Sequence, residues 1–495
     1  MKMETNRRIF LHRAITLCGV GLAACVTPTL ALAEKVARKL GQIKATVIQR
    51  FDPDYEKYRA AMTASHRFRM PDRYPDAIVM VENLDDITEA LRYARSNKLK
   101  IAMRGTGHTA IQTCLRNGGL LLDLSRLNQI EVDPDSQTAW VQPGARMIEL
   151  LAATEPHGLA FPGAHGAAVG LGGYLLGGGI GWNTPNWGIA CRSVIEAEVM
   201  AADGTLINVS ENNHADLLWA LRGAGSGFFG VVTRFRIKLY PMPKAITASY
   251  YTFTEQQLPL LAETLEQLMP TKDPRIEALI SLGFNKAFSS LTPEFSEEEI
   301  HCTVDLYAFS ESDENNRQLL EIFANNPLFK EAGIKREHQA RTYQDLYGFR
   351  DTQTNAARKR TNTDNMWMDK PKESFLDYIE LFKQCPSPYS RVQLCWSMNI
   401  MGMAANTSFP NFADHYMYMV LTAKDEQEEK ANKGWMEKSN RLVRKYAKGH
   451  YINEAEYELF PERIPGCFTK EGWKQLGVLR VKYDPEAVFH NFLGY

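Results

Sequence analysis

The sequence predicts an α+β protein in which a second α+β domain is inserted between the two parts of a first domain. Three observations predict this class. Strand and helix patterns alternate over residues 77–124, a glycine-dense segment follows at 162–188, and residues 245–446 mix strands and helices without glycine clusters. We therefore expect domain segments at 34–243, 244–446 and 447–495, the last of them returning to the first domain.

The composition is that of an ordinary globular protein. With 495 residues, 44% of them hydrophobic, the chain is long enough for two or three packed domains. The 57 Lys and Arg residues nearly balance the 58 Asp and Glu residues, so we expect no nucleic-acid partner. Beyond the N-terminus no apolar run approaches the roughly eighteen residues of a membrane span, so we expect no span.

The cysteines do not indicate a metal site. None of those after residue 33 forms a CxxC pair or lies beside histidines at metal-ligand spacing. We expect buried thiols, with a single disulfide such as Cys385–Cys395 as the alternative in an oxidising compartment. The cysteines concerned are Cys114, Cys191, Cys302, Cys385, Cys395 and Cys467.

The N-terminus is typical of an export signal. The twin arginines Arg7 and Arg8 precede an apolar stretch at 14–22, and the small residues ALA at 31–33 offer a cleavage site. This pattern predicts a Tat-type signal peptide over residues 1–33, a partnership with the Tat export machinery, and a periplasmic or secreted protein. The alternative is a lipobox at 22–25, LAAC, which would leave the protein lipid-anchored through Cys25.

The first domain begins with a strand–helix–strand pattern. Apolar strands at 77–81 and 101–103 flank an amphipathic helix at 85–97, so the loop after residue 103 lies at the carboxyl edge of a βαβ unit, where cofactors commonly dock. A third strand is expected at 120–124. A hairpin at 130–132 and 138–141 and a helix at 147–157 follow.

The segment at 162–188 reads PGAHGAAVGLGGYLLGGGIGWNTPNWG. Glycine is so frequent that neither a helix nor a strand can run through the segment without a cost in stability. Glycines let backbone N–H groups approach a ligand closely, and successive N–H groups form an anion-binding nest. The segment therefore predicts a site for a pyrophosphate-bearing cofactor.

The second domain should contain strands at 278–281, 302–306, 392–400 and 416–422, with helices at 256–268 and 315–323. In the strand at 392–400, polar and apolar residues alternate, which predicts one polar face that either meets substrate or meets solvent. Tyr416 and Tyr418 share a face of a later strand and either stack on a ring of the substrate or pack in the ordinary way. The polar residues are Gln393, Cys395, Ser397 and Asn399.

The glycine turn at 104–110, RGTGHTA, has two interpretations. It fits the G-x-G-x-x-A fingerprint of a nicotinamide-dinucleotide site, with Asp123 roughly twenty residues further on. That site requires a helix to begin directly after the turn, whereas residues 110–118 form a poor helix start. A nicotinamide dehydrogenase is therefore the weaker alternative.

A series of further motifs occurs in order along the chain. They are RGTGH (104–108), LLLDL (120–124), VQPGA (141–145), VGLGG (169–173), GGG (177–179), ADG (202–204), LLWALRG (217–223) and FGVVT (229–233). Together they resemble the berberine bridge enzyme-like FAD-linked oxidases of the vanillyl-alcohol oxidase superfamily, over residues 55–243 and again over 450–489. The resemblance implies a PCMH-type FAD-binding domain, with its core at about 71–243, and an inserted substrate domain in which helices cover an antiparallel sheet.

The resemblance also implies how FAD is held. His108 matches the histidine that is bonded covalently to the 8α-methyl group of the flavin. Gly166 stands where some members have a second linking cysteine, so a single attachment is expected. Val169 matches an oxygen gatekeeper whose small side chain admits dioxygen, which favours an oxidase that uses O₂ and yields H₂O₂. The cofactor-binding residues expected with His108 are Arg104, Gly105, Thr106, Gly107, Thr109, Val169, Gly170, Gly172, Gly173, Gly177 and Val231.

The catalytic element implied by the resemblance is YIN at 451–453. Tyr451 would remove a proton from an alcohol, sugar or amine while a hydride leaves its carbon, with Asn453 as its partner. This role needs a tyrosine pKa below the usual ~10, lowered by positive charge or hydrogen bonds. The sequence departs from the family pattern at Glu454 and Glu456, where Tyr and Asp are usual. The alternatives left open are a dehydrogenase with a periplasmic electron acceptor and a flavin-binding protein without turnover.

Overall fold

The computed structural model describes residues 43–62, 71–284, 287, 296, 299–348, 360–401, 406–410 and 412–493. The expected export signal at 1–33 and the alternative anchor Cys25 lie outside these residues. No helix in the described ranges has the length and apolar character needed to cross a membrane.

The described cysteines are free thiols, so the alternative Cys385–Cys395 disulfide does not form. Five of the six are buried, as the sequence predicts, and Cys395 is partly exposed. Within the described ranges no three metal-ligating side chains come together.

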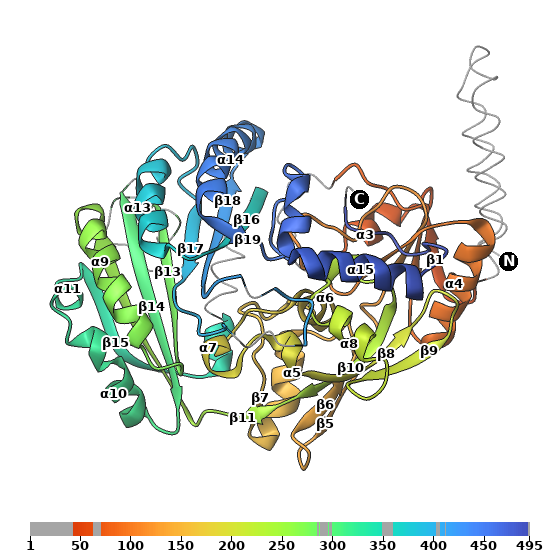
Figure 1. Cartoon of the computed structure of the whole chain (residues 1–495), viewed down its shortest axis with the longest axis horizontal. Helices are drawn as coiled ribbons and strands as arrows, with labels where there is room; N and C mark the ends of the chain where they lie inside the picture. Colours follow the sequence, from red (N-terminus) through yellow and green to blue (C-terminus); the bar gives the residue numbers. More distant parts are fainter. Residues whose placement is uncertain are drawn as a thin grey trace.

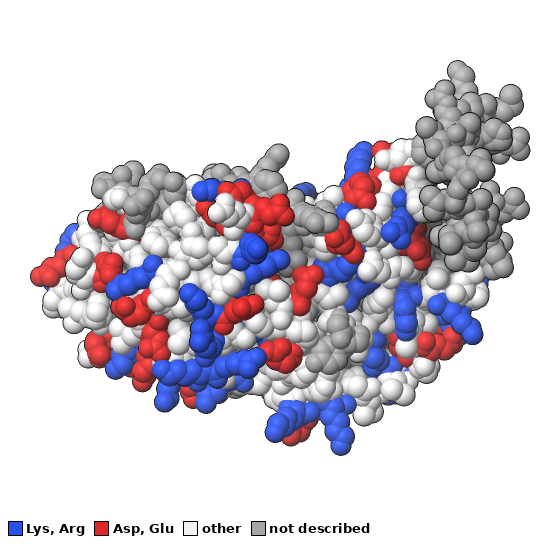
Figure 2. Space-filling view, turned by 90° about the horizontal axis from the view of Figure 1, so that it is seen from above, with Lys and Arg blue, Asp and Glu red and all other residues white. Residues whose placement is uncertain are grey.

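The chain folds into two halves that lie side by side in Figure 1. The half on the right of the view holds two sheets built from residues 46–238, together with the C-terminal helix. The half on the left is one eight-stranded sheet with helices along its outer face. Acidic and basic side chains are interspersed over the face seen in Figure 2, in keeping with their near-equal numbers.

The first half begins with a four-stranded sheet. Its order is β1 (Thr46–Gln49), β2 (Ala77–Met80), β4 (Leu120–Asp123) and β3 (Ile101–Arg104). β4 runs parallel to both of its neighbours, and β1 runs antiparallel to β2. The predicted strand–helix–strand order is confirmed, because α4 (Leu84–Asn97) joins β2 to β3 after a capping box between Asn83 and Asp86. The loop after β3 therefore emerges at the carboxyl edge of the sheet.

A five-stranded antiparallel sheet completes the first half. Its order is β5 (Ile130–Asp133), β6 (Thr138–Val141), β10 (Val231–Lys238), β8 (Val194–Met200) and β9 (Leu206–Ser210). The predicted hairpin and helix are confirmed as β5–β6 and as α5 (Met147–Thr154), which a 3₁₀ turn extends to His157. The remaining short elements are α3 (Tyr55–Arg59), α8 (Ala215–Leu221), β7 (Leu159–Ala160) and β11 (Tyr240–Pro241).

The glycine-dense segment contains two short helices, α6 (Leu171–Gly177) and α7 (Thr184–Trp187). Helix therefore forms here only in two short pieces, and each carries the cost that the glycines impose. Other parts of the chain lie so close to these helices that a side chain would not fit at the glycines. A Cβ on Gly172 would lie 2.8 Å from the Cβ of Pro143, and a Cβ on Gly177 would overlap the Asn453 amide. Close packing thus offsets the cost of about 1 kcal/mol for each glycine in a helix.

The second half is an antiparallel sheet with helices on its outer face. Buried apolar side chains from alternate strand positions, such as Val392, Leu394 and Met417, pack against those helices. In spatial order the strands are β15 (Ile334–Arg341), β12 (Ala245–Thr254), β14 (Ile300–Ser310), β13 (Ile276–Phe284), β17 (Arg391–Cys395), β18 (His415–Ala423), β16 (Arg360–Met368) and β19 (Ala447–Gly449). The helices are α9 (Leu258–Leu268), α10 (Asp313–Ala324), α11 (Pro327–Lys330), α13 (Pro371–Phe382) and α14 (Glu426–Tyr446).

The strand predicted at 392–400 ends at Cys395. Ser397 and Asn399 adopt left-handed backbone conformations with φ of 53° and 56°, which no strand continues through. The N–H groups of the residues that follow them bind a later segment instead of a neighbouring strand. Met398 N–H donates to the Asp414 carbonyl, and Ile400 N–H donates to the Asp414 carboxylate. The polar face that the sequence predicts is therefore limited to its first two members, Gln393 and Cys395.

The C-terminal segment lies against the first half of the molecule. Helix α15 (Lys470–Tyr483) runs across that half in Figure 1, and Tyr483 donates a hydrogen bond of 2.9 Å to Asp216 in the first turn of α8. Beyond the helix, Phe489 forms a parallel bridge with Ile101, and His490 N–H donates to the Ile101 carbonyl at 2.9 Å. The segment that carries residue 451 is thus anchored beside β3.

Candidate active site

A cavity of about 870 Å³ lies between the two halves of the molecule. One wall is formed by the loop after β3, by the glycine-dense segment and by residues 225–232, and the other by strands β16, β17 and β18. The sequence-predicted residues that line it are Arg104, Gly105, Thr106, Gly107, His108, Thr109, Val169, Gly170, Gly172, Gly173, Tyr451 and Asn453. Gly177 and Val231 do not line it: Gly177 packs on Asn453, and Val231 is buried in β10 between two lining residues.

Arg104 fixes the start of the loop. Its buried guanidinium donates to the Asp123 carboxylate from Nε at 2.9 Å, and to the Arg59 carbonyl from Nη1 at 3.0 Å. Asp123 is thereby occupied, because it also accepts the Ser125 N–H at 2.9 Å. It is not available to a ribose, and residues 105–119 form no helix. The nicotinamide-dinucleotide interpretation of the turn is therefore wrong.

The two glycine-bearing loops interlock in the wall. A Cβ on Gly170 would lie 2.5 Å from Thr106 Oγ1, so the loop after β3 and the glycine-dense segment approach as closely as backbone allows. His108 is exposed on this wall and lines the cavity. A Cβ on Gly166 would lie 3.9 Å from His108 Nε2 and 3.3 Å from Val169 Cγ2. His108, Gly166 and Val169 therefore form one corner of the cavity.

A buried arginine marks the part of the cavity nearest the C-terminal segment. Arg116 Nη2 donates to the Asn491 carbonyl at 3.0 Å, while its Nε has no hydrogen-bond partner within the described chain. Burial lowers the pKa of Arg116 to about 10. A desolvated cation with an unused donor beside glycine-rich loops fits the pyrophosphate of a dinucleotide cofactor. The sequence analysis missed Arg116, because it stands outside the family motifs.

Tyr451 lies where the glycine-dense segment meets strand β16, with its side chain 3% exposed. Its hydroxyl oxygen accepts the Gly179 N–H at 3.0 Å and the Asn453 Nδ2–H at 3.0 Å. The same Asn453 nitrogen donates to the Gly173 carbonyl at 3.2 Å. The YIN element is therefore bound to the glycine-dense segment at two points, and its Tyr451 and Asn453 side chains are in direct contact.

The pKa of Tyr451 is raised, not lowered. Burial is the main cause, and the nearby Glu454 carboxyl adds to it, because both disfavour a phenolate. The hydrogen bonds from Gly179 and Asn453 act in the opposite direction but are outweighed. The expectation of a lowered pKa is therefore wrong for the protein without ligand.

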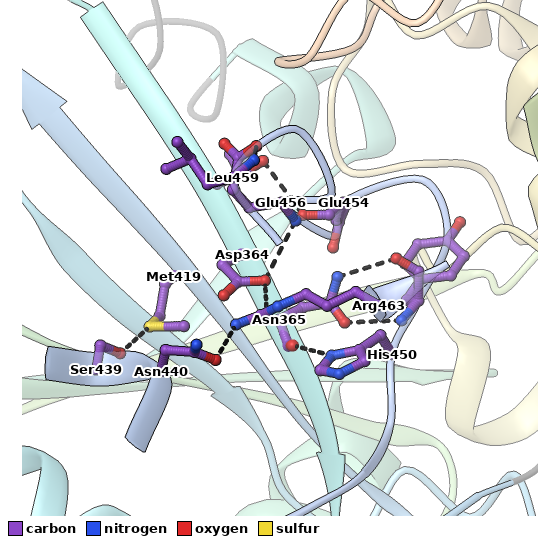
Figure 3. A network of polar contacts seen from close by, with 12 residues as sticks. Asp364, Asn365, Met419, Ser439, Asn440, His450, Glu454, Glu456, Leu459 and Arg463 are labelled. Carbon is purple, nitrogen blue, oxygen red and sulfur yellow. Dashed lines mark hydrogen bonds and ion pairs between the residues drawn. The ribbon is translucent and has the colours of Figure 1, made fainter. Parts of the chain in front are cut away.

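A polar network holds Tyr451 from the other side (Figure 3). Asn365 of β16 accepts the Tyr451 N–H at 2.7 Å and donates to the Tyr451 carbonyl at 2.9 Å, so both main-chain groups of the residue are bound by one amide. Its own carbonyl bonds to His450 Nδ1 at 2.8 Å. Next to it, the buried Asp364 carboxylate forms an ion pair with Arg463 and accepts the Glu456 N–H at 3.2 Å. The sequence analysis singled out none of Asn365, Asp364 and Arg463.

Replacing Arg463 by Met should destabilise the protein by about 3–5 kcal/mol, because Asp364 would be left buried and uncompensated. Burial already raises the pKa of Asp364 to about 6 despite Arg463. A raised folded-state pKa means that stability is lost as the pH rises through that value, so the deficit of Arg463→Met should shrink in acid. Denaturant unfolding from pH 5 to 8 measures it. Arg444→Met, which breaks an exposed pair with Glu462, is the matched control and should cost about 0–1 kcal/mol; an equal loss in both variants would contradict the prediction.

A second polar bridge joins the halves on the other side of the cavity. His165 Nε2 lies 2.5 Å from Glu277 Oε1 on β13, and Glu277 Oε2 accepts the Asn183 N–H at 2.6 Å. The His165 ring also meets Trp182 edge-on, with centroids 4.5 Å apart. The glycine-dense segment is thereby attached to the sheet that forms the opposite wall.

Comparison with known proteins agrees with this architecture. Residues 75–210 match the FAD binding domain family. The chain is 28% identical over 466 residues to YgaK, an uncharacterized FAD-linked oxidoreductase of Bacillus subtilis (strain 168). The alignment covers 90% of this chain and 96% of YgaK.

The fold is that of solved flavoprotein structures. Berberine bridge enzyme from Eschscholzia californica superimposes with a TM-score of 0.77 at 20% identity, covering 93% of this chain and 98% of that one. Phl p 4.0202, a glucose dehydrogenase, gives a TM-score of 0.76 at 19% identity over 90% and 95% of the two chains. An isoleucine-to-valine variant of Phl p 4, described as a glucose oxidase, gives 0.75.

Proposed function

We propose that the chain is an FAD-linked oxidoreductase, as its relatives and its fold support, and that it is an oxidase that takes a hydride from a C–H bond of an alcohol, sugar or amine. The observation that carries the proposal is the single cavity that joins the glycine loops around His108 to the Tyr451–Asn453 pair. A substrate in that cavity meets the cofactor loops on one side and a proton acceptor on the other.

FAD fits the wall built by these loops. The glycine backbone that lines the cavity, as at Gly105 and Gly173, and the unused Nε–H of buried Arg116 suit its pyrophosphate. We propose that His108 carries the covalent bond and that the attachment is single, because Gly166, the neighbour at that corner, has no side chain to form a second one. When bound, FAD supplies the hydride acceptor, and in an oxidase its electrons pass on to O₂ to give H₂O₂.

Tyr451 is the proposed base. In its phenolate form, Tyr451 accepts the proton of the substrate O–H or N–H on its oxygen, which the N–H groups of Gly179 and Asn453 hold in place. Asn365 fixes the main chain of Tyr451 from behind, so the oxygen keeps one position relative to the cofactor loops. Because burial raises the pKa of Tyr451, its hydroxyl must lose its own proton before it can act as the base.

Val169 supports an oxidase over a dehydrogenase. It lines the cavity in the same corner as His108 and Gly166, and its side chain is shorter than that of isoleucine. The isoleucine-to-valine variant of Phl p 4 is a glucose oxidase, which supports the view that a valine is compatible with reaction with oxygen. We propose further that residues 1–33 direct export by the Tat route, which carries proteins already loaded with cofactor.

Anaerobic mixing of the holoenzyme with a panel of alcohols, sugars and amines tests the function. We expect one class to bleach the flavin absorbance and air to restore it with one H₂O₂ per turnover. A flavin that stays reduced in air but is reoxidised by a dye would make the protein a dehydrogenase. Flavin that no member of the panel bleaches would overturn the proposed turnover.

A further inference from the structure

One carboxyl group faces the cavity from the substrate side. Glu454 lies three residues after Tyr451 in a turn closed by its N–H to the Tyr451 carbonyl, at 3.1 Å, and it lines the cavity together with Tyr451. Its main-chain carbonyl accepts a hydrogen bond from Thr363 of β16 at 3.3 Å. The carboxylate oxygen Oε2 accepts a hydrogen bond from the Tyr416 hydroxyl. Figure 3 shows Glu454 at the end of the network that binds Tyr451.

Aromatic rings surround this carboxyl group. The rings of Tyr416 and Tyr451 meet edge-on with centroids 6.1 Å apart, and Tyr418, two residues along the same strand face, also lines the cavity. Glu454 raises the pKa of all three tyrosines through its charge, which shows that the three hydroxyls lie within its electrostatic reach. The geometry is therefore a carboxylate set among three phenol rings at the wall of a cavity.

The negative charge of Glu454 is not neutralised by the described chain. No ion pair to it occurs among the described residues. The cation on the neighbouring strand, Arg391, lines the cavity and acts on Tyr418, whose pKa it lowers. Burial raises the pKa of Glu454 to about 7, and the Tyr416 hydrogen bond limits the rise. A desolvated carboxyl group of this kind favours its charged form only when a cation joins it.

We infer that Glu454 is the anchor for a positively charged ammonium group of the substrate, which it holds between the rings of Tyr416, Tyr418 and Tyr451. A carboxylate and aromatic faces are the two groups that attract an organic ammonium ion most strongly in a cavity. The inference rests on the proposed function and narrows its substrate class to cationic amines. Glu454 thereby takes the specificity role, while Tyr451 keeps the role of base.

The pairing makes binding depend on pH in one direction. A fixed cation binds the ionised carboxylate, so its affinity should rise about tenfold per pH unit below pH 7 and level off above it. The titratable and charged groups that face Glu454 are Tyr416 and Tyr418 of β18, Tyr451 of its own segment and Arg391 of β17. The tyrosines stay neutral through this range because their pKa values are raised, and an arginine stays charged, so Glu454 alone sets the dependence.

Calorimetric titration of the oxidised holoenzyme with benzyltrimethylammonium, between pH 6 and 8.5, tests the inference. The probe carries its charge at every pH, and benzyl alcohol serves as the neutral probe. We expect the cation to bind more tightly as the pH rises, and Glu454→Gln to weaken it about tenfold or more with no remaining pH dependence. Glu458→Gln, an exposed glutamate of the same segment, is the matched control and should leave binding unchanged.

Tyr416→Phe gives a second, independent result. Loss of its hydrogen bond should raise the pKa of the Glu454 carboxyl. The midpoint pH of the rise in cation affinity should therefore move upward, whereas the affinity reached at high pH should equal that of the wild type. Equal affinities of wild type and Glu454→Gln for the cation would overturn the inference. Binding is measured without turnover, so the two proposals fail separately. A protein that oxidises alcohols but does not bind the cation would refute only the role of Glu454. A protein that binds the cation but whose flavin no substrate bleaches would refute only the proposed function.

Discussion

Tyr451→Phe should slow the reduction of the bound flavin by substrate about a hundredfold or more, and it should leave the flavin in place. The phenyl ring keeps the packing of Tyr451 in its apolar surroundings, but it removes the oxygen that accepts the Gly179 and Asn453 N–H groups. General-base catalysis contributes about 10²–10⁴ to such rates. Anaerobic stopped-flow absorbance at saturating substrate measures the effect directly.

The pH dependence separates a base from a packing residue. Burial raises the pKa of Tyr451, so its phenolate form grows as the pH rises, and the wild-type reduction rate should increase with pH. In Tyr451→Phe that increase should disappear. Tyr446→Phe is the control, because that hydroxyl bonds to Asp377 at 2.6 Å outside the cavity. An unchanged reduction rate in Tyr451→Phe would remove Tyr451 as the base.

His108→Ala should abolish the covalent attachment of FAD while leaving it bound without a bond. The loops around Thr106 and Gly170 still interlock in that variant, so the backbone that approaches the cofactor stays in place. After acid precipitation we expect the wild-type pellet to be yellow, and the variant pellet to be colourless above a yellow supernatant. Loss of the bond should also lower the reduction potential of the flavin, because attachment withdraws electron density from the ring.

His157→Ala is the control for that experiment, since His157 is exposed at the end of the 3₁₀ turn after α5. Its pellet should stay yellow. Flavin retained in the His108→Ala pellet would place the bond on another residue, and peptide mapping of that pellet would identify it.

Local sequence patterns predicted the elements that depend on local contacts. The β2–α4–β3 order and the β5–β6 hairpin follow from periodicity and turn residues that lie within a few positions of one another. Most of the motif residues that the sequence predicts for the cofactor line one cavity, because residues such as Gly105 and Gly170 carry backbone requirements of their own.

Features that depend on distant contacts were missed. The strand through Cys395 looks continuous in the sequence, and only Asp414, on a later segment, shows why it stops. Asn365 and Tyr451 are 86 positions apart, and nothing near either residue indicates that one amide holds the other. Glu454 was noticed as a departure from the family pattern, but its meeting with Tyr416 depends on the folded sheet. The direction of the Tyr451 pKa shift failed for the same reason, because burial is a property of the whole fold.

The two hydrogen bonds between the Asn365 side chain and the Tyr451 main chain limit how enzymes of this fold can diverge or be re-engineered. The proposed base, Tyr451, belongs to the C-terminal segment, yet Asn365, which binds its main chain, belongs to the eight-stranded sheet. Replacing the eight-stranded sheet by that of a relative would change the substrate-facing residues. The same replacement would also remove Asn365, which holds Tyr451. Chimeras should therefore keep Asn365 and residues 450–463 as a single inherited unit, since specificity and catalytic competence are not separable modules in this chain.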